Sequence, residues 1–205
     1  QSGFFSEAIC SFRMAMECLN ANLGESSVST AAEYSELPAA PIDVACIDAN
    51  IILEASPHNT FDVYQTAFAF PKMRSLAFFQ TEVSVVLFYN LAVAHHLTGL
   101  AGTEQSELHL QHAQKFYKIA LTIFKSTPGL RVDASCFAMV LGMLTNMGHI
   151  FTHFFNPKDA ASCRHHMEEI LQSSALLDLS EEDGEFFDSA LTYSQAHDTV
   201  AAAAA

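Results

Sequence analysis

Histidine is the residue type whose number and spacing in this sequence first suggest chemistry. The chain contains ten histidines in 205 residues. His149 and His153 stand four residues apart, a spacing that places two imidazoles on one face of a helix, as in metal sites. His165 follows on the next expected helix, so a zinc or other transition-metal site at these three histidines is chemically possible. The set lacks the glutamate of an HExxH motif, and we interpret the histidines first as separate groove or surface side chains.

Motifs of other enzyme chemistries are not found in the sequence. It has no GxSxG nucleophile elbow, no GxxxxGK[ST] phosphate loop and no GxGxxG dinucleotide motif. The cysteines number five, and none of them forms a CxxC pair. An odd number of cysteines without paired spacing is typical of a reducing compartment. We therefore expect a protein that is not an enzyme, needs no cofactor, and resides in an intracellular reducing compartment, either the cytoplasm or an organelle interior.

The composition limits the classes of partner. Half of the residues are hydrophobic and 16% are charged, which supplies enough apolar surface for one or two cores. The formal net charge of −14 repels nucleic-acid phosphates and anionic lipids, so we expect no nucleic-acid partner. The most apolar run, residues 83–100, is interrupted by polar residues such as Asn90 and His95. This pattern favours a buried helix over a transmembrane segment.

Apolar periodicity and helix-ending residues predict a mostly helical chain. Helices are expected at 7–19, 81–98, 104–125, 133–155 and 158–176, and a last helix is expected to open at Ser180 with the acidic residues typical of an N-terminus. The remaining segments are a Ser-, Ala- and Pro-rich loop at 20–41, a strand or short helix at 42–53, and an aromatic stretch at 61–70. For the aromatic stretch we expect irregular structure with short strands or a hairpin.

Two pairs of these helices match each other. The pattern Phe88-x-Asn90-Leu91-Ala92-x-x-His95 recurs as Leu144-x-Asn146-Met147-Gly148-x-x-Phe151. A second pattern places an aromatic residue between two small ones, as in Ala113-x-x-x-Tyr117-x-x-Ala120. The same pattern opens the chain as Ala8-x-x-x-Phe12-x-x-Ala15. Small residues at these positions let two helices approach closely, and the large residue fills the gap beside them.

These patterns resemble the tetratricopeptide repeat, a helical hairpin of about 34 residues with small and aromatic residues at fixed positions. The resemblance implies an all-α fold of tandem antiparallel hairpins, a TPR-like α-solenoid with a long irregular insertion. It assigns 1–20 to the second helix of a partial repeat whose first helix lies upstream, 21–74 to the insertion, 75–130 and 131–178 to two hairpins, and 179–205 to a capping helix and tail. The helices around Asn90 and Asn146 also look like repeats in a set of diatom-type algal proteins, which implies no function.

The resemblance implies a concave face that binds a partner peptide or helix. Its residues would be Val86, Tyr89, Asn90, Val93, His96, Thr145, Asn146, His149, Thr152 and His153. Neither 80–98 nor 132–156 contains Lys or Arg, so we expect no carboxylate-clamp peptide. Asn90 and Asn146 occupy equivalent positions, and a buried asparagine there bonds either to the backbone of a bound peptide or to a neighbouring helix end.

The function expected from these features is a non-enzymatic protein–protein interaction module. It would serve as a scaffold, an adaptor or an accessory subunit of a larger assembly, with the apolar insertion adding to the binding surface. The alternative is a metal-binding or metal-dependent protein that uses the cluster of His149, His153 and His165.

Overall fold

The computed structural model describes residues 9–15, 45–47, 63–69, 80–102, 104–126, 134–172 and 179–203. Within these ranges the chain is mostly helical, which confirms the predicted all-α class. Residues 9–15 form a short α-helix, and the long helices that follow are α2 (Gln80–Leu100), α3 (Ser106–Ser126), α4 (Ala134–His153), α5 (Pro157–Leu171) and α6 (Glu181–Ala203). Two short strands, β1 (Ala45–Ile47) and β2 (Ala67–Ala69), pair in antiparallel fashion.

The strands show which alternative is right for the two ambiguous segments. The segment 42–53 contains a strand and not a short helix in its described part. The aromatic stretch also contains a short strand, but its partner is β1, with Cys46 opposite Phe68, and not a neighbouring strand of a local hairpin. The rest of the predicted insertion, including most of 21–62 and 70–74, lies outside the described residues.

Local sequence signals set the helix ends. Gly102 takes a positive φ of 72° just after α2, a conformation that glycine adopts without steric cost. At the start of α5, the Asn156 side chain accepts a hydrogen bond from the Asp159 amide and Pro157 occupies the first turn. Two predicted ends are corrected. The helix predicted to Phe155 ends at His153, and the helix predicted to residue 176 has its C-cap at Gln172.

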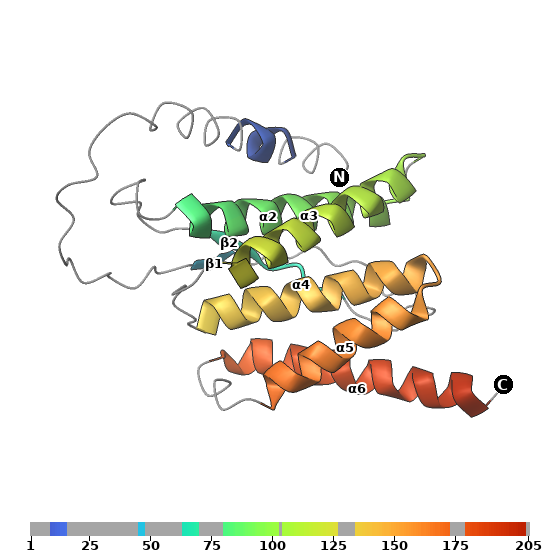
Figure 1. Cartoon of the computed structure of the whole chain (residues 1–205). Coiled ribbons are helices and arrows are strands. Elements are labelled where there is room, and N and C mark those ends of the chain that lie inside the picture. Colours follow the sequence, from blue (N-terminus) through green and yellow to red (C-terminus); the bar gives the residue numbers. More distant parts are fainter. Residues whose placement is uncertain are drawn as a thin grey trace.

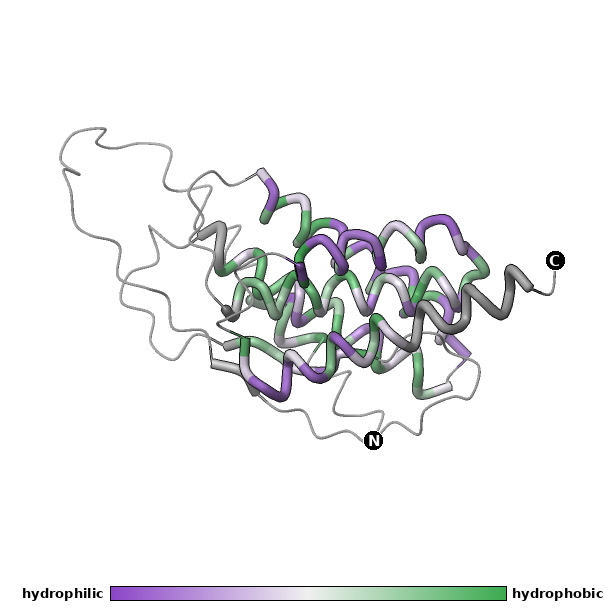
Figure 2. Tube along the Cα trace, turned by 90° about the horizontal axis from the view of Figure 1, so that it is seen from below, coloured by the Kyte–Doolittle hydropathy of each residue, from purple (hydrophilic) through white to green (hydrophobic). Residues whose placement is uncertain are grey.

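The helices are arranged as successive neighbours that run in opposite directions (Figure 1). α2 packs mainly against α3 and α4 mainly against α5, while α4 also contacts α2, α3 and α6. α2 and α3 lie very close together at Gly99. A Cβ at this position would stand only 2.8 Å from the Leu110 side chain, so glycine permits the close approach. Hydrophobic and hydrophilic stretches alternate along the helix traces (Figure 2), as expected for helices that turn one face to a core.

The core lies between α2, α3, α4, α5 and α6. The small–aromatic–small pattern of α3 faces it, since Ala113, Tyr117 and Ala120 are fully buried. Among the described residues, one helical window, Val83–Leu100, is long and apolar enough to cross a membrane, with a mean hydropathy of 1.4. In the structure 78% of this window is buried. Buried core helices of water-soluble domains have the same length and apolar composition.

Candidate functional site

Two asparagines hold an extended segment of the chain against the inner face of the helices. Asn90 on α2 binds Phe68 through both ends of its amide: Oδ1 accepts from the Phe68 N–H at 3.0 Å, and Nδ2 donates to the Phe68 carbonyl at 2.6 Å. Asn146 on α4 binds Tyr64 in the same way, with distances of 2.8 and 2.9 Å. Each amide therefore satisfies the donor and the acceptor of one backbone residue.

The two contacts fall four residues apart on the segment 63–69, which we call the docked segment. Between them, the Tyr89 hydroxyl donates to the Thr66 carbonyl at 3.0 Å. Side chains from α2 and α4 thus bind the backbone of every second residue, the periodicity of an extended chain. All of these contacts are made to backbone atoms. They therefore depend on the extended conformation of the segment and not on the identity of its side chains.

The side chains of Tyr64 and Phe68 share one side of the docked segment and enter the core. Tyr64 is 4% exposed and Phe68 is 1% exposed. The Phe68 ring meets Tyr89 edge-on at 5.2 Å between centroids, and the Tyr64 ring lies 4.8 Å from Phe187. The Tyr64 hydroxyl donates to Asp183 Oδ1 at 2.6 Å. The docked segment therefore occupies two aromatic pockets in addition to the backbone contacts.

Gly142 and Asp183 shape the pocket that receives Tyr64. A Cβ at Gly142 would lie 2.4 Å from Tyr64 Cδ1, so only glycine leaves room for this ring on α4. Asp183 is fixed by the start of α6, where its amide donates to Ser180 Oγ at 3.1 Å and its second carboxylate oxygen accepts from the same hydroxyl at 2.6 Å. This confirms Ser180 as the predicted N-cap, and the cap also orients the acceptor for Tyr64.

A second layer of polar side chains supports Asn146. Its Nδ2 also donates to the Tyr117 hydroxyl at 2.8 Å, and burial raises the pKa of that phenol, so it stays neutral. His96 packs edge-on against Tyr117 with 6.1 Å between ring centroids. His96 Nε2 lies 3.0 Å from His149 Nδ1, so one ring nitrogen donates a hydrogen bond and the other accepts it.

The paired histidines are neutral near pH 7. Burial, and then the nearby charge of His153, lowers the pKa of His149 to about 4. Burial, followed by the charges of His149 and His153, lowers the pKa of His96 well below its usual value. A second contact joins His95 and His109, whose Nδ1 atoms are 2.9 Å apart. Burial and then the charge of His109 lower the pKa of His95 to about 4.

The three histidines proposed as metal ligands are not brought together. His149 pairs with His96 from α2, His165 lies 3.4 Å from Glu169 on its own helix, and the exposed His153 packs against Phe154. Across the described ranges, no group of three or more His, Cys, Asp or Glu side chains is placed to hold a metal ion.

The predicted concave face turns inward in this structure. Eight of its ten residues are buried, Thr152 is half-buried and His153 is exposed; the buried residues are Val86, Tyr89, Asn90, Val93, His96, Thr145, Asn146 and His149. Three of them, Tyr89, Asn90 and Asn146, contact the docked segment through hydrogen bonds. Thr145 and Thr152 instead donate to carbonyls one turn back on α4.

Four residues of this candidate site were not predicted from the sequence: Tyr64, Phe68, Gly142 and Asp183. The one sequence feature that could have indicated them is the spacing Tyr64-x-x-x-Phe68, which equals the spacing of the two backbone contacts. No sequence pattern links this segment to Asn90 and Asn146, since the contacts join residues 22 and 82 positions apart.

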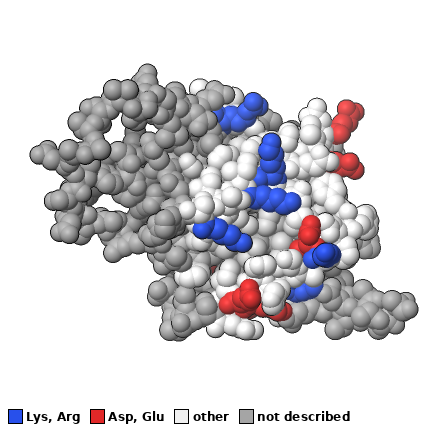
Figure 3. Space-filling model, viewed as in Figure 1, with Lys and Arg blue, Asp and Glu red and all other residues white. Residues whose placement is uncertain are grey.

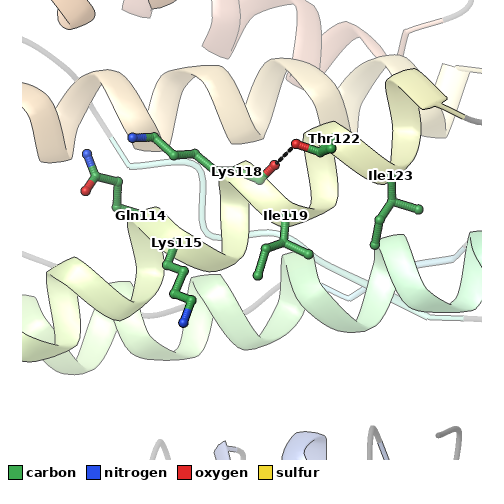
Figure 4. Close-up of a pocket in the computed structure, with 6 residues that line it drawn as sticks. All are labelled: Gln114, Lys115, Lys118, Ile119, Thr122 and Ile123. Atoms are coloured by element: carbon green, nitrogen blue, oxygen red, sulfur yellow. Dashed lines mark hydrogen bonds between the residues drawn. The ribbon is translucent and has the colours of Figure 1, made fainter.

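A separate shallow groove of about 470 Å³ follows the outer side of α3. It is lined by Gln114, Lys115, Lys118, Ile119, Thr122 and Ile123 (Figure 4). Several Lys and Arg side chains lie across the middle of this face of the molecule, and Asp and Glu side chains lie at its upper right, at its bottom and beside one of the basic groups (Figure 3). Lys118 is positioned over the Phe151 ring, with Nζ 5.2 Å from the centroid. The groove combines apolar and basic side chains on an otherwise acidic protein.

Comparison of the chain with protein-family models, with curated proteins and with solved structures gave no match. The resemblance of the helical patterns to the tetratricopeptide repeat therefore stays a prediction. The function is argued from the geometry of the asparagine contacts and the aromatic pockets.

Proposed function

We propose that this protein is a non-enzymatic protein–protein interaction module, a TPR-like array of helical hairpins that binds an extended segment of a partner protein along α2 and α4. One observation carries the proposal: Asn90 and Asn146, at equivalent positions of two matching helices, each bind the backbone of an extended segment through both ends of the amide. The function would be that of a scaffold, an adaptor or an accessory subunit.

The geometry supports peptide binding because the site on α2 and α4 that holds the docked segment already satisfies a peptide backbone. We call this site the groove, and it is distinct from the shallow groove on α3. Asn90 and Asn146 together make four hydrogen bonds to the docked segment, and Tyr89 adds a fifth. A net contribution of about 1 kcal/mol for each hydrogen bond would make these side chains a substantial part of the binding energy. A partner segment that adopts the same extended conformation would meet the same donors and acceptors.

The charge of the groove supports a particular kind of peptide. The described side chains of α2 and α4 include no Lys or Arg, and the backbone contacts are made by two neutral amides and the Tyr89 hydroxyl. We therefore propose that the partner is bound through an internal stretch of its chain and not through a C-terminal carboxylate. The alternative of a metal-dependent function has no supporting group of ligands in the described part of the chain.

The experiment is a selection of peptides from a random library displayed on phage, followed by affinity measurements with purified variants. A selected peptide that is N-methylated at the residue bound by Asn90 or by Asn146 should bind about tenfold or more weakly, because the hydrogen bond from its backbone N–H is lost. Asn90→Ala or Asn146→Ala should remove most of that loss, because the bond is then absent for both forms of the peptide. Thr192→Ala is the control, since that exposed side chain lies on α6 and bonds to its own helix. An N-methylation loss that is equally large in the folded asparagine variants would contradict the proposal.

A further inference from the structure

The docked segment does more than show how a peptide backbone could bind, because it also fills both aromatic pockets of the groove. We infer that residues 63–69 act as an internal competitor, and that the partner is an extended peptide with a tyrosine and, four residues later, a phenylalanine, which displaces them. This inference rests on the proposed function and names its partner class and its regulation.

The spacing of the pockets sets the partner sequence. The groove holds backbone at Asn146 and at Asn90, and each of these contacts lies beside one pocket. The pocket next to Asn146 accepts the Tyr64 ring, and the pocket next to Asn90 accepts the Phe68 ring against Tyr89. A bound peptide with the same backbone contacts must present its side chains at the same interval of four residues.

The two pockets differ in polarity, and this difference determines the order of the two aromatic residues in the partner peptide. At the first pocket, Asp183 accepts a hydrogen bond from the Tyr64 hydroxyl at 2.6 Å. At the second pocket, the Phe68 ring is 1% exposed and meets the Tyr89 ring edge-on. The first position therefore prefers tyrosine and the second prefers phenylalanine. A peptide with the reversed order would place a hydroxyl in the apolar pocket and leave the Asp183 carboxylate without that donor.

Competition follows from the overlap of the two ligands. The partner peptide requires the same Asn90 and Asn146 amides and the same two pockets, so the docked segment has to leave before the peptide binds. The apparent affinity of the groove is then reduced by the fraction of molecules in which the docked segment occupies it. Substitutions in residues 63–69 that weaken their contacts with α2 and α4 raise the affinity for a partner peptide. The same substitutions in the partner peptide lower that affinity.

The test uses a synthetic peptide with the sequence of residues 61–71 as the probe, and measures its affinity for the full chain by fluorescence anisotropy. Replacing tyrosine by phenylalanine in the peptide removes one hydrogen bond to Asp183, and we expect a loss of about tenfold. The substitution Tyr64→Phe in the protein removes the same bond from the competitor, and we expect a gain of about tenfold. The same change from tyrosine to phenylalanine thus lowers the affinity when made in the peptide and raises it when made in the protein. A purely structural role of Tyr64 would not produce these opposite effects.

Tyr64→Phe keeps the ring in the core, so the test does not depend on a variant that lacks a buried aromatic side chain. Gly142→Ala gives a second measurement, because the added Cβ closes the tyrosine pocket to either ligand. It should abolish the gain that Tyr64→Phe produces. Gly184→Ala is its control, since a Cβ there meets nothing within 4 Å.

The outcomes separate this inference from the proposed function. Library peptides that need Asn90 and Asn146, but show no preference for aromatic residues and bind equally to Tyr64→Phe, would leave the proposed function intact and overturn the inference. If no peptide binds any variant, both fail. A stable dimer that exchanges residues 63–69 between two copies, detected by light scattering, would also overturn the inference, because the occupant would then be a second copy of this chain.

Discussion

Gly142 offers the sharpest single test of how the docked segment is held, because its substitution acts on one aromatic ring. A Cβ at this position would stand 2.4 Å from Tyr64 Cδ1, 3.1 Å from Tyr64 Cε1 and 3.0 Å from the Tyr89 hydroxyl. Ordinary carbon contacts are about 3.5–4.0 Å, so in Gly142→Ala the Tyr64 ring has to move by about 1 Å or more. The movement disturbs its packing on Phe187 and its hydrogen bond to Asp183.

The expected magnitude is the difference between two opposing effects. Alanine in a helix interior stabilises by about 1 kcal/mol relative to glycine. Inserting a methyl group into a filled core costs about 1–3 kcal/mol, and loss of the Tyr64 hydrogen bond adds about 1 kcal/mol. We therefore expect Gly142→Ala to lower the free energy of unfolding by about 1–3 kcal/mol, measured by urea denaturation followed by circular dichroism.

Gly184→Ala is the matched control for this measurement. It also replaces a helical glycine, but the new Cβ meets nothing within 4 Å, so we expect a gain of up to about 1 kcal/mol. The two variants should thus differ by about 1–4 kcal/mol in unfolding free energy. If Gly142→Ala is as stable as Gly184→Ala, the Tyr64 ring does not pack against Gly142 of α4 in the folded protein.

Three further predictions concern individual side chains. Asn146→Ala should lower the unfolding free energy by about 3–4 kcal/mol and Asn90→Ala by about 2 kcal/mol, because they remove three and two hydrogen bonds, respectively; urea denaturation measures both. The unfolded chain protonates His149 below about pH 6.5 and the folded chain only near pH 4, so stability falls as the pH drops through this window, on the order of 1 kcal/mol by pH 5.5. His149→Gln should reduce that slope, as measured by urea denaturation at a series of pH values. Burial, and then the charge of Asp159, raises the pKa of the Cys163 thiol to about 12, so in the native protein iodoacetamide should label the exposed Cys10 and spare Cys163, as read by peptide mass spectrometry.

The helices could be predicted because their signals are local. Apolar periodicity indicated each long helix, and Asn156-Pro157 and Ser180 marked helix starts that the structure confirms through hydrogen bonds of the caps. The ends after His153 and Gln172 were predicted less well. Phe154 and Phe155 continue the apolar pattern beyond α4, although the chain already turns there and Phe155 takes a positive φ of 53°.

The candidate site could be predicted only in part, because its contacts are not local. The equivalence of Asn90 and Asn146 was visible in the matching helices, but their binding partner is an extended segment that no periodicity connects to them. The spacing of His149 and His153, which suggested a metal site, was a local signal that tertiary packing overrides. It describes one helix alone, whereas the pairing of His149 with His96 depends on how α4 is rotated against α2.

The most direct test of the account is to remove single backbone donors from a peptide that the library selects for this groove. N-methylation replaces one N–H and leaves the side chain unchanged, so it separates backbone recognition from side-chain recognition. We predict that N-methylation at the residue bound by Asn146, and at the residue four positions later, weakens binding about tenfold or more, whereas N-methylation midway between them has a much smaller effect. Equal losses at all three positions, or no loss at the two asparagine positions, would contradict the claim that Asn90 and Asn146 bind an extended polypeptide by its backbone.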